Sequence, residues 1–295
     1  MAIIQPIKKR IQALKAEFDT LKSGKESLLT MIDEVEIPEN VYNSNAIENS
    51  TLTLKETEKI LLEQELSRHV HLREVFEAKN LARVVTYKRN KTHSDALTRD
   101  LILLLHHMLI GGIDDSIAGR FRKQGEFVRV GTYIAPASER VERMIEEVLL
   151  ECSSNLGMYF LDKIAKSHLE FESIHPFLDG NDRIGRVIVN FQLLQYGFPR
   201  IIIRNKEKDA YYQAFKDYNE KKNTKLMEKI LALSLMEALH KRVMYMKGET
   251  IITLSSYINT HNYSAPALTN AARRQTIPAF REKGVWKIGE GFRYK

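Results

Sequence analysis

The 295-residue sequence has one cysteine, few glycines and prolines, and no long apolar run. Cys152 alone excludes an internal disulfide and fits a reducing compartment, so we expect a cytoplasmic protein. The N-terminus lacks the apolar stretch of a signal peptide, and no segment approaches the roughly 18 apolar residues of a membrane span. These absences lead us to expect no membrane partner.

Glycine and proline, the residues that interrupt helices, number only 14 and 7. Long segments carry apolar residues at helical spacing, which predicts a mainly α fold. We expect helical patterns over 7–36, 52–90, 100–110, 137–152, 156–174, 184–197 and 206–246, and a loop at 90–95. Residues 127–134 alternate and include β-branched side chains, which predicts a short hairpin. The formal net charge of +7 permits an anionic partner, either a nucleotide or nucleic acid.

The side chains best suited to catalysis and to phosphate binding lie close together in residues 175–186, HPFLDGNDRIGR. Pro176 stops the preceding helix, and residues 179–181 are turn formers that lead into the next helix. The N-terminus of that helix suits a phosphate, and Arg183 and Arg186 lie three residues apart on one of its faces. His175 can take a proton from an attacking hydroxyl, and Asp179 can hold Mg²⁺ on phosphates. One loop thus supplies a base, a metal ligand and an anion cradle.

A metal site on the helix before the loop is a weaker alternative. His168, Glu172 and His175 share one helical face. The continuation PFLDGN favours the phosphate interpretation instead.

The segment resembles the signature of the Fic family, His-Pro-Phe-x-(Asp/Glu)-Gly-Asn-Gly-Arg-x-x-Arg. The resemblance implies a helical core and transfer of AMP from ATP to a Ser, Thr or Tyr hydroxyl of a target protein, and of the enzyme itself. It implies His175 as the base, Asp179 as the Mg²⁺ ligand and Arg186 on the γ-phosphate. The rest of the phosphate cradle would be Gly180, Asn181 and Arg183.

Further segments extend the resemblance over roughly 40–230. Residues 119–122 and 128–131 look like the lead into the family's flap hairpin, which aligns the target peptide. Ser44 and Glu48, in SNAIEN, resemble the family's inhibitory motif, so Glu48 would pair with Arg186. Tyr212 and Asn219 lie in a stretch similar to the one that contacts adenosine.

Asp182 departs from the signature, which has glycine at this position. Aspartate tolerates a left-handed backbone, so the loop shape can survive. A carboxylate that faces phosphate oxygens would weaken ATP binding, whereas one that faces solvent or shares the metal would not. Because of Asp182, a DNA-binding regulator with a degraded or ligand-sensing Fic core is the alternative to an active transferase.

The tail after residue 249 differs in character. We expect a helix at 254–259, a basic helix from Pro266 to Lys283 and two strands around the Gly-Glu-Gly turn at 289–291. This order resembles a winged-helix module that binds DNA or RNA; packing and oligomerisation, for example as a homodimer, are the alternatives. The expected organisation is a helical region at 1–95, a Fic core at 96–248 and a small α+β winged-helix-like module at 249–295.

Overall fold

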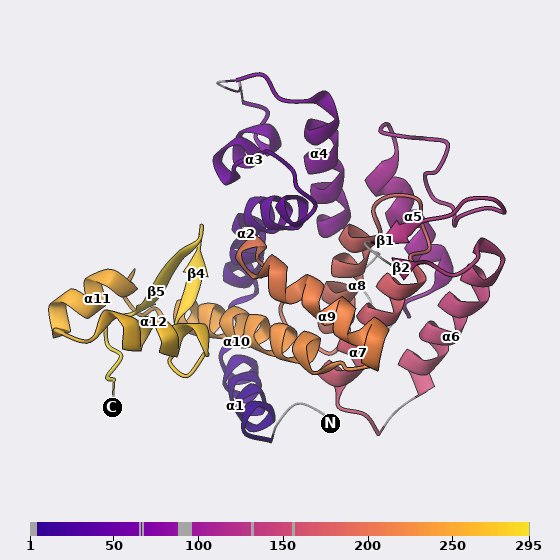
Figure 1. Ribbon diagram of the computed structural model, residues 1–295. Helices are drawn as coiled ribbons and strands as arrows, with labels where there is room; N and C mark the ends of the chain where they lie inside the picture. The colour runs from indigo at the N-terminus through magenta and orange to yellow at the C-terminus, as the bar shows by residue number, and fades with distance from the viewer. Residues whose placement is uncertain are drawn as a thin grey trace.

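The computed structural model describes residues 5–64, 66, 68–87, 96–130, 133–154 and 157–294. The fold is mainly helical, as the sequence predicts (Figure 1). The α-helices are α1 (Gln5–Leu21), α2 (Glu26–Ile47), α3 (Leu54–Leu61), α4 (Leu72–Thr86), α5 (Arg99–Ile110), α6 (Val141–Ser154), α7 (Phe160–Ile174), α8 (Asn181–Gln195), α9 (Lys208–Lys221), α10 (Lys225–Lys247), α11 (Leu254–His261) and α12 (Ala265–Arg273). The strands are β1 (Arg129–Val130), β2 (Tyr133–Ile134), β3 (Ile251–Thr253), β4 (Phe280–Glu282) and β5 (Val285–Gly289), and the 3₁₀ turns are η1 (Ser138–Arg140) and η2 (Asn205–Glu207).

Several helices begin or end where the local sequence dictates. Thr53 and Glu56 form a capping box at the start of α3, which satisfies backbone N–H groups that the helix leaves unpaired. The pattern over 206–246 forms two helices rather than one, because α9 ends at Lys222, whose φ of 52° is left-handed. The pattern over 7–36 likewise divides between α1 and α2 near Gly24, with a φ of 74°. The loop expected at 90–95 lies outside the described residues.

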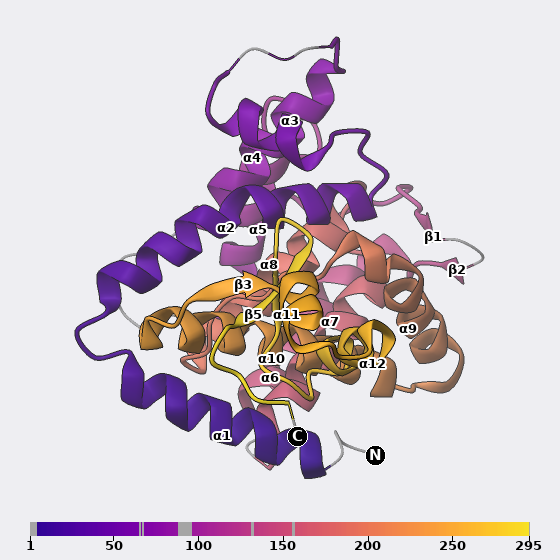
Figure 2. The ribbon, with the colours of Figure 1, turned by 90° about the vertical axis from the view of Figure 1, so that its left-hand side faces the viewer.

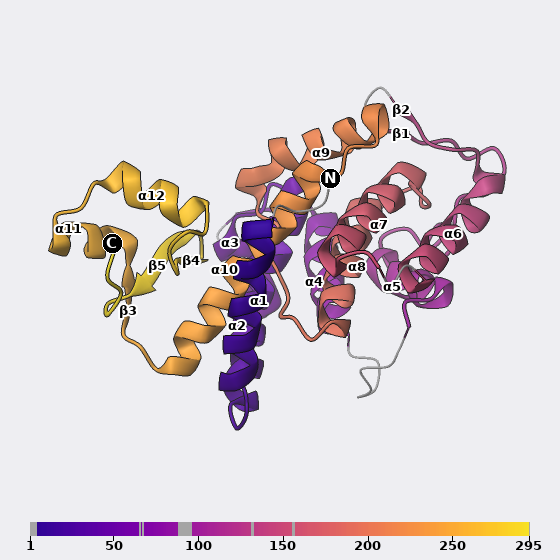
Figure 3. The ribbon, with the colours of Figure 1, turned by 90° about the horizontal axis from the view of Figure 1, so that it is seen from below.

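Two apolar cores meet along α7 and α8. One core joins these helices to α1, α9 and α10, and α1 packs along α10 (Figure 3). The other joins them to α2–α6. The loop between α7 and α8 therefore lies at the junction of the two cores, supported from both sides. Within the described ranges, no helix combines the length and apolarity that crossing a bilayer requires.

Residues 249–294 pack around a small core of their own, with Leu254, Tyr257, Leu268 and Ile288 at its centre. Strands β3, β5 and β4, in that order, form an antiparallel sheet beside α11 and α12. We call residues 249–294 the C-terminal module. It projects to one side of the helical body at the end of α10 (Figures 1 and 3).

Two expectations for this module are wrong. The helix expected from Pro266 to Lys283 ends at Arg273, because a left-handed residue, Gln275 (φ 52°), and then Pro278 interrupt it. Arg281 consequently lies on strand β4. The hairpin turn is Lys283–Gly284 rather than Gly-Glu-Gly, because both residues adopt the positive φ of a two-residue hairpin turn, 49° and 78°.

Candidate functional site

The loop between α7 and α8 takes its shape from two left-handed residues. His175 ends α7 with a φ of 50°, and Pro176 follows it and cannot continue the helix. Gly180 precedes α8 with a φ of 80°. A Cβ at Gly180 would lie 3.0 Å from Leu109 Cδ2, so both the backbone angle and the close packing require glycine.

Contacts of Phe177, Asn181 and His106 of α5 fix the shape of the loop and hold it against the core. Phe177 is fully buried and stacks on the His106 ring, with a centroid distance of 3.7 Å. His106 Nδ1 accepts the Gly119 N–H at 3.0 Å, which leaves its Nε2–H to donate to the Asp179 carbonyl, also at 3.0 Å. Asn181 closes the loop on itself, because its side chain both accepts the Phe177 N–H (2.8 Å) and donates to the Phe177 carbonyl (2.9 Å).

Arg122 ties the segment before the hairpin to this loop. Its guanidinium donates to the His175 carbonyl at 2.8 Å and to the Pro136 carbonyl at 2.9 Å. The Arg122 N–H donates to the Pro176 carbonyl at 2.9 Å. Strands β1 and β2 pair as the expected hairpin, with Val130 opposite Tyr133, and its tip at 131–132 lies outside the described residues. The hairpin is therefore held close to His175.

Arg186 is buried on α8 and faces the end of α2. It donates to Ser44 Oγ and to the Ser44 carbonyl, both at 2.9 Å, and its Nη2 lies 3.1 Å from Glu48 Oε1. The Tyr211 hydroxyl lies 3.5 Å from its Nη1. The structure thus brings Ser44, Glu48 and Arg186 together across about half of the chain, as the resemblance implies.

Asp179 lies between two arginines. Arg183 Nη2 donates to Asp179 Oδ1 at 2.9 Å, and Arg73 of α4 binds Oδ2. Arg183 also pairs with Glu77 at 3.3 Å. The Asp179 side chain remains one-third exposed. It is a carboxylate at the mouth of a polar cavity, the kind of ligand that Mg²⁺ uses together with phosphate oxygens.

Asp182 faces the site rather than open solvent. Its carboxyl group lies beside those of Glu48 and Glu172 and near Arg186. Burial raises the pKa of Glu48 to about 7; Arg186 opposes this shift and Asp182 adds to it. Burial and Asp182 together raise the pKa of Glu172 well above its usual range. Three carboxyl groups therefore crowd one arginine, and this crowding opposes ionisation of Glu48 and Glu172.

His175 is held neutral. Burial lowers its pKa to about 4, although the nearby Glu172 carbonyl favours the charged form. Its Nδ1 lies 3.3 Å from the Glu172 carbonyl, so Nδ1 carries the proton and donates. Nε2 then keeps a free lone pair, which is the atom that a general base needs.

The alternative metal site on α7 is not formed. His168 Nε2 bonds to the Tyr211 hydroxyl at 2.8 Å. Among the described residues, no group of three or more His, Cys, Asp or Glu side chains is arranged to hold a metal ion.

Two cavities share His175 and Asp182. The first, of about 400 Å³, is polar and lies between the loop and residues 45–50 and 73–77. The second, of about 520 Å³, lies between α7, α9 and the hairpin. Tyr212 and Asn219 line the second cavity; the Tyr212 hydroxyl donates to the Ile47 carbonyl (3.1 Å), and Asn219 accepts from Ser173 Oγ (2.7 Å).

Most of the site residues singled out from the sequence line one or both of these cavities, whereas Ser44 and Arg186 line neither and meet the site through Glu48. Asn181 lines the first cavity, but its amide is used to brace the loop. Sequence reasoning missed His106, Arg122, Arg73 and Glu77. His106 sits in an apolar helical run, where a buried histidine usually has a specific partner, and this signal was available. The other three look like ordinary surface charges in the sequence.

Comparison with known proteins agrees with this geometry. The model of the Fic/DOC family matches residues 96–193. Over 186 residues the chain is 30% identical to a protein adenylyltransferase Fic of Nematostella vectensis, covering 61% of this chain and 43% of the relative. A Drosophila persimilis protein of the same name is 27% identical over 217 residues, covering 72% of this chain and 42% of the relative. The chain therefore spans less than half the length of these relatives.

Solved structures share the fold. A Fic domain-containing signaling protein from Bacteroides thetaiotaomicron superposes with a TM-score of 0.73 at 23% identity, covering 82% of this chain and 98% of that one. A Fic family protein from Desulfovibrio desulfuricans covers 100% of this chain and 99% of its own, with a TM-score of 0.64 at 20% identity. Family match, fold and loop agree: residues 96–193 of this chain carry a Fic domain.

Proposed function

We propose that the protein is an adenylyltransferase that moves AMP from ATP onto a protein hydroxyl, and that Glu48 restrains it. The observation that carries the proposal is that His175, Asp179 and Arg183 line two adjoining cavities, and that Arg186 is paired with Glu48, which lines the first of them. The larger cavity has aromatic and amide side chains that suit an adenosine, and the polar one suits phosphates. Relatives named protein adenylyltransferase Fic support the same activity.

In this mechanism the acceptor hydroxyl enters between the hairpin and His175. His175 Nε2 takes the hydroxyl proton while the oxygen attacks the α-phosphorus of ATP. The bond from the α-phosphorus to the bridging oxygen of the β-phosphate breaks, and pyrophosphate leaves. The N-terminus of α8 and Arg183 stabilise the charge on the phosphates. Asp179 would hold a Mg²⁺ ion, which neutralises phosphate charge when bound.

Glu48 restrains the reaction by occupying Arg186. While Arg186 donates to Ser44 and Glu48, it is unavailable to the γ-phosphate. A triphosphate placed without this clamp does not present its α-phosphorus to the hydroxyl on His175, because productive transfer depends on placement within a fraction of an ångström.

Intact-mass analysis after incubation with ATP and Mg²⁺ tests the activity directly. The expected result is a species heavier by one AMP, formed by the parent chain and absent from His175→Ala. If neither the parent nor Glu48→Gly gains this mass, with or without added candidate target proteins, the proposal is wrong.

DNA binding through residues 249–294 is a second candidate. The strand order β3-β5-β4 beside α11 and α12 resembles that of a winged helix, and Arg273 and Arg274 are exposed at the end of α12. Against it, Arg281 is engaged by Glu207 and Glu237. Binding of the full chain to duplex DNA should weaken steeply with salt; no retention at low salt would remove this candidate.

A further inference from the structure

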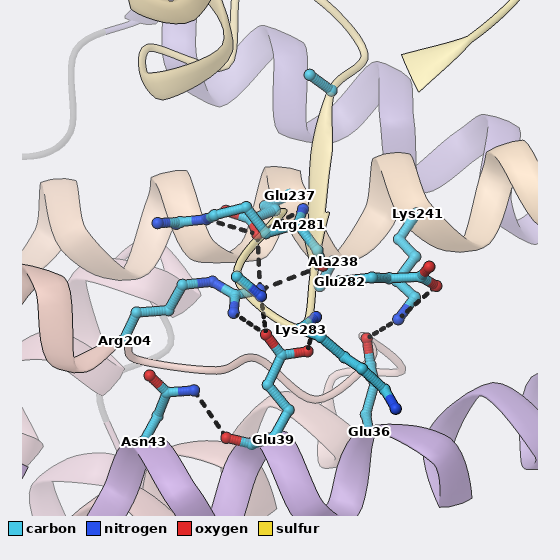
Figure 4. A network of polar contacts seen from close by, with 12 residues as sticks. Glu36, Glu39, Asn43, Arg204, Glu237, Ala238, Lys241, Arg281, Glu282 and Lys283 are labelled. Atoms are coloured by element: carbon cyan, nitrogen blue, oxygen red, sulfur yellow. Dashed lines mark hydrogen bonds and ion pairs between the residues drawn. The ribbon is translucent and has the colours of Figure 1, made fainter. Parts of the chain in front are cut away.

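The C-terminal module touches the helix that carries Ser44 and Glu48 through a buried cluster of charged residues (Figure 4). Glu39 of α2 is 5% exposed. Its Oε2 accepts the Lys283 N–H and its Oε1 accepts the Gly284 N–H, both at 3.1 Å. These two donors form the turn between β4 and β5, so the tip of the module's hairpin rests on α2 (Figure 2).

Two arginines complete this cluster, which we call the Glu39 network. Arg204 pairs with Glu39 and also with Glu237 of α10, at 2.8 Å. Arg281 of β4 binds Glu237 at 2.7 Å (Figure 4). Arg204 and Glu237 are both more than nine-tenths buried. Because a buried charge that loses its partner is strongly destabilising, the members of the network keep or lose their positions together.

Residues 39–48, the end of α2 and its C-cap Glu48, link this network to the site. Asn43 donates to the Glu39 carbonyl at 2.7 Å and accepts the Asn205 N–H at 3.0 Å. The next residue, Ser44, binds Arg186. Pro38 lies inside α2 just before this segment and lacks the N–H that would bond the preceding turn. Pro38 thus removes one of the backbone hydrogen bonds between this segment and the first half of α2.

We propose that the C-terminal module controls the placement of Glu48 on Arg186 through the Glu39 network, with Glu39 as a positioning residue. This inference rests on the proposed restraint of AMP transfer by Glu48. The segment 39–48 is held at one end by the module and at the other by Arg186. A partner that moves the β4–β5 turn therefore loosens Glu48. By reciprocity, ATP that displaces Glu48 changes the module.

The full-length variant Glu39→Gln tests the forward direction. It keeps the size and one acceptor of the side chain but removes the charge that pairs with Arg204. We expect self-AMP transfer to rise about fivefold, within the range of ordinary allosteric coupling. Glu58→Gln is the matched control, because Glu58 of α3 pairs with Lys283 Nζ at 2.8 Å but lies outside α2. Glu39→Gln added to Glu48→Gly should give no further rise; an additive rise, or an equal effect of Glu58→Gln, overturns the proposal.

The intrinsic fluorescence of Trp286 tests the reverse direction. Trp286 is the single tryptophan of the chain, and the Arg281 guanidinium lies 4.6 Å from its ring centroid. We expect ATP with Mg²⁺ to change its fluorescence in the parent chain and not in Glu39→Gln. Calorimetric binding of ATP with no fluorescence change in the parent overturns the coupling.

Hydrogen exchange separates failure of the coupling from failure of the proposed function. If the chain binds no ATP, the proposed function fails, but amides 43–48 should still exchange faster in Glu39→Gln than in Glu58→Gln. Equal exchange in the two variants overturns the coupling whatever the activity proves to be.

Discussion

Asp182 stands where the Fic signature has glycine, and its carboxyl group lies beside Glu48 and Glu172. The sequence left open whether this side chain faces phosphate or solvent. In the structure it borders both cavities, so a bound triphosphate would meet an extra negative charge. Unit charges 4 Å apart interact by about 4 kcal/mol at an effective dielectric of about 20, which sets the upper limit of the effect.

Asp182→Asn should therefore tighten the binding of ATP with Mg²⁺ by at least about tenfold, because it removes the charge and keeps the volume. Asp182→Gly should do the same. Calorimetry of both variants measures the dissociation constants. Asp209→Asn, at an exposed position on α9, is the control and should change nothing. Unchanged or weaker binding in both Asp182 variants would show that the carboxylate does not oppose phosphate.

Glu48 makes the stability of the protein depend on pH. Its pKa is raised to about 7 in the folded state, mainly by burial, above the usual 4.5. The unfolded state therefore releases this proton first, so the stability that protonated Glu48 contributes is fully present at pH 4 and is lost as the pH rises to 8. The Arg186 guanidinium and the Asp182 and Glu172 carboxyl groups face Glu48 and set the size of the effect.

Compared with Glu48→Gln, which mimics the protonated form, the parent chain should be equally stable at pH 4, below both pKa values of Glu48. At pH 8 it should be less stable by up to about 3 kcal/mol. Urea unfolding at both pH values measures the difference. A parent chain that gains stability relative to Glu48→Gln as the pH rises would contradict the assignment.

At the scale of elements, the helices and the β1–β2 hairpin were predictable because their signals are local. Apolar periodicity places the helices, and His175–Pro176 marks the end of α7. The C-terminal module was predicted less well. A left-handed residue and a proline end α12 early, and the sequence contains two glycine-bearing segments that could form the turn. Only strand pairing decides that Lys283–Gly284 forms it.

The packing of α7 on α8 depends on Gly185. A Cβ there would lie 2.1 Å from Glu172 Oε1 and 2.9 Å from His168 Cε1. Gly185→Ala should lower the free energy of unfolding by about 1–3 kcal/mol, as overpacking does. Gly157→Ala, where nothing lies within 4 Å of the new Cβ, should have little effect. Denaturant unfolding measures both; equal stability of Gly185→Ala and the parent would show that α7 and α8 can separate freely.

At the scale of the whole molecule, contacts between distant charges decide what the site can do, and the sequence does not reveal them. Arg281 looked like a residue for nucleic acid, yet it binds Glu237 and Glu207. Arg73 looked like a surface charge, yet it binds Asp179 from 106 residues away. The Glu48–Arg186 contact was predictable only because both residues belong to motifs that the resemblance joins.

The central claim is that this contact holds back AMP transfer, and the rate of self-labelling by ATP measures it most directly. Glu48→Gly should transfer AMP at least about tenfold faster than the parent, because Arg186 is freed to place the phosphates. Glu48→Gly with His175→Ala should bind ATP nearly as well and transfer nothing. A Glu48→Gly variant no faster than the parent, or a double variant that still labels itself, would contradict the account.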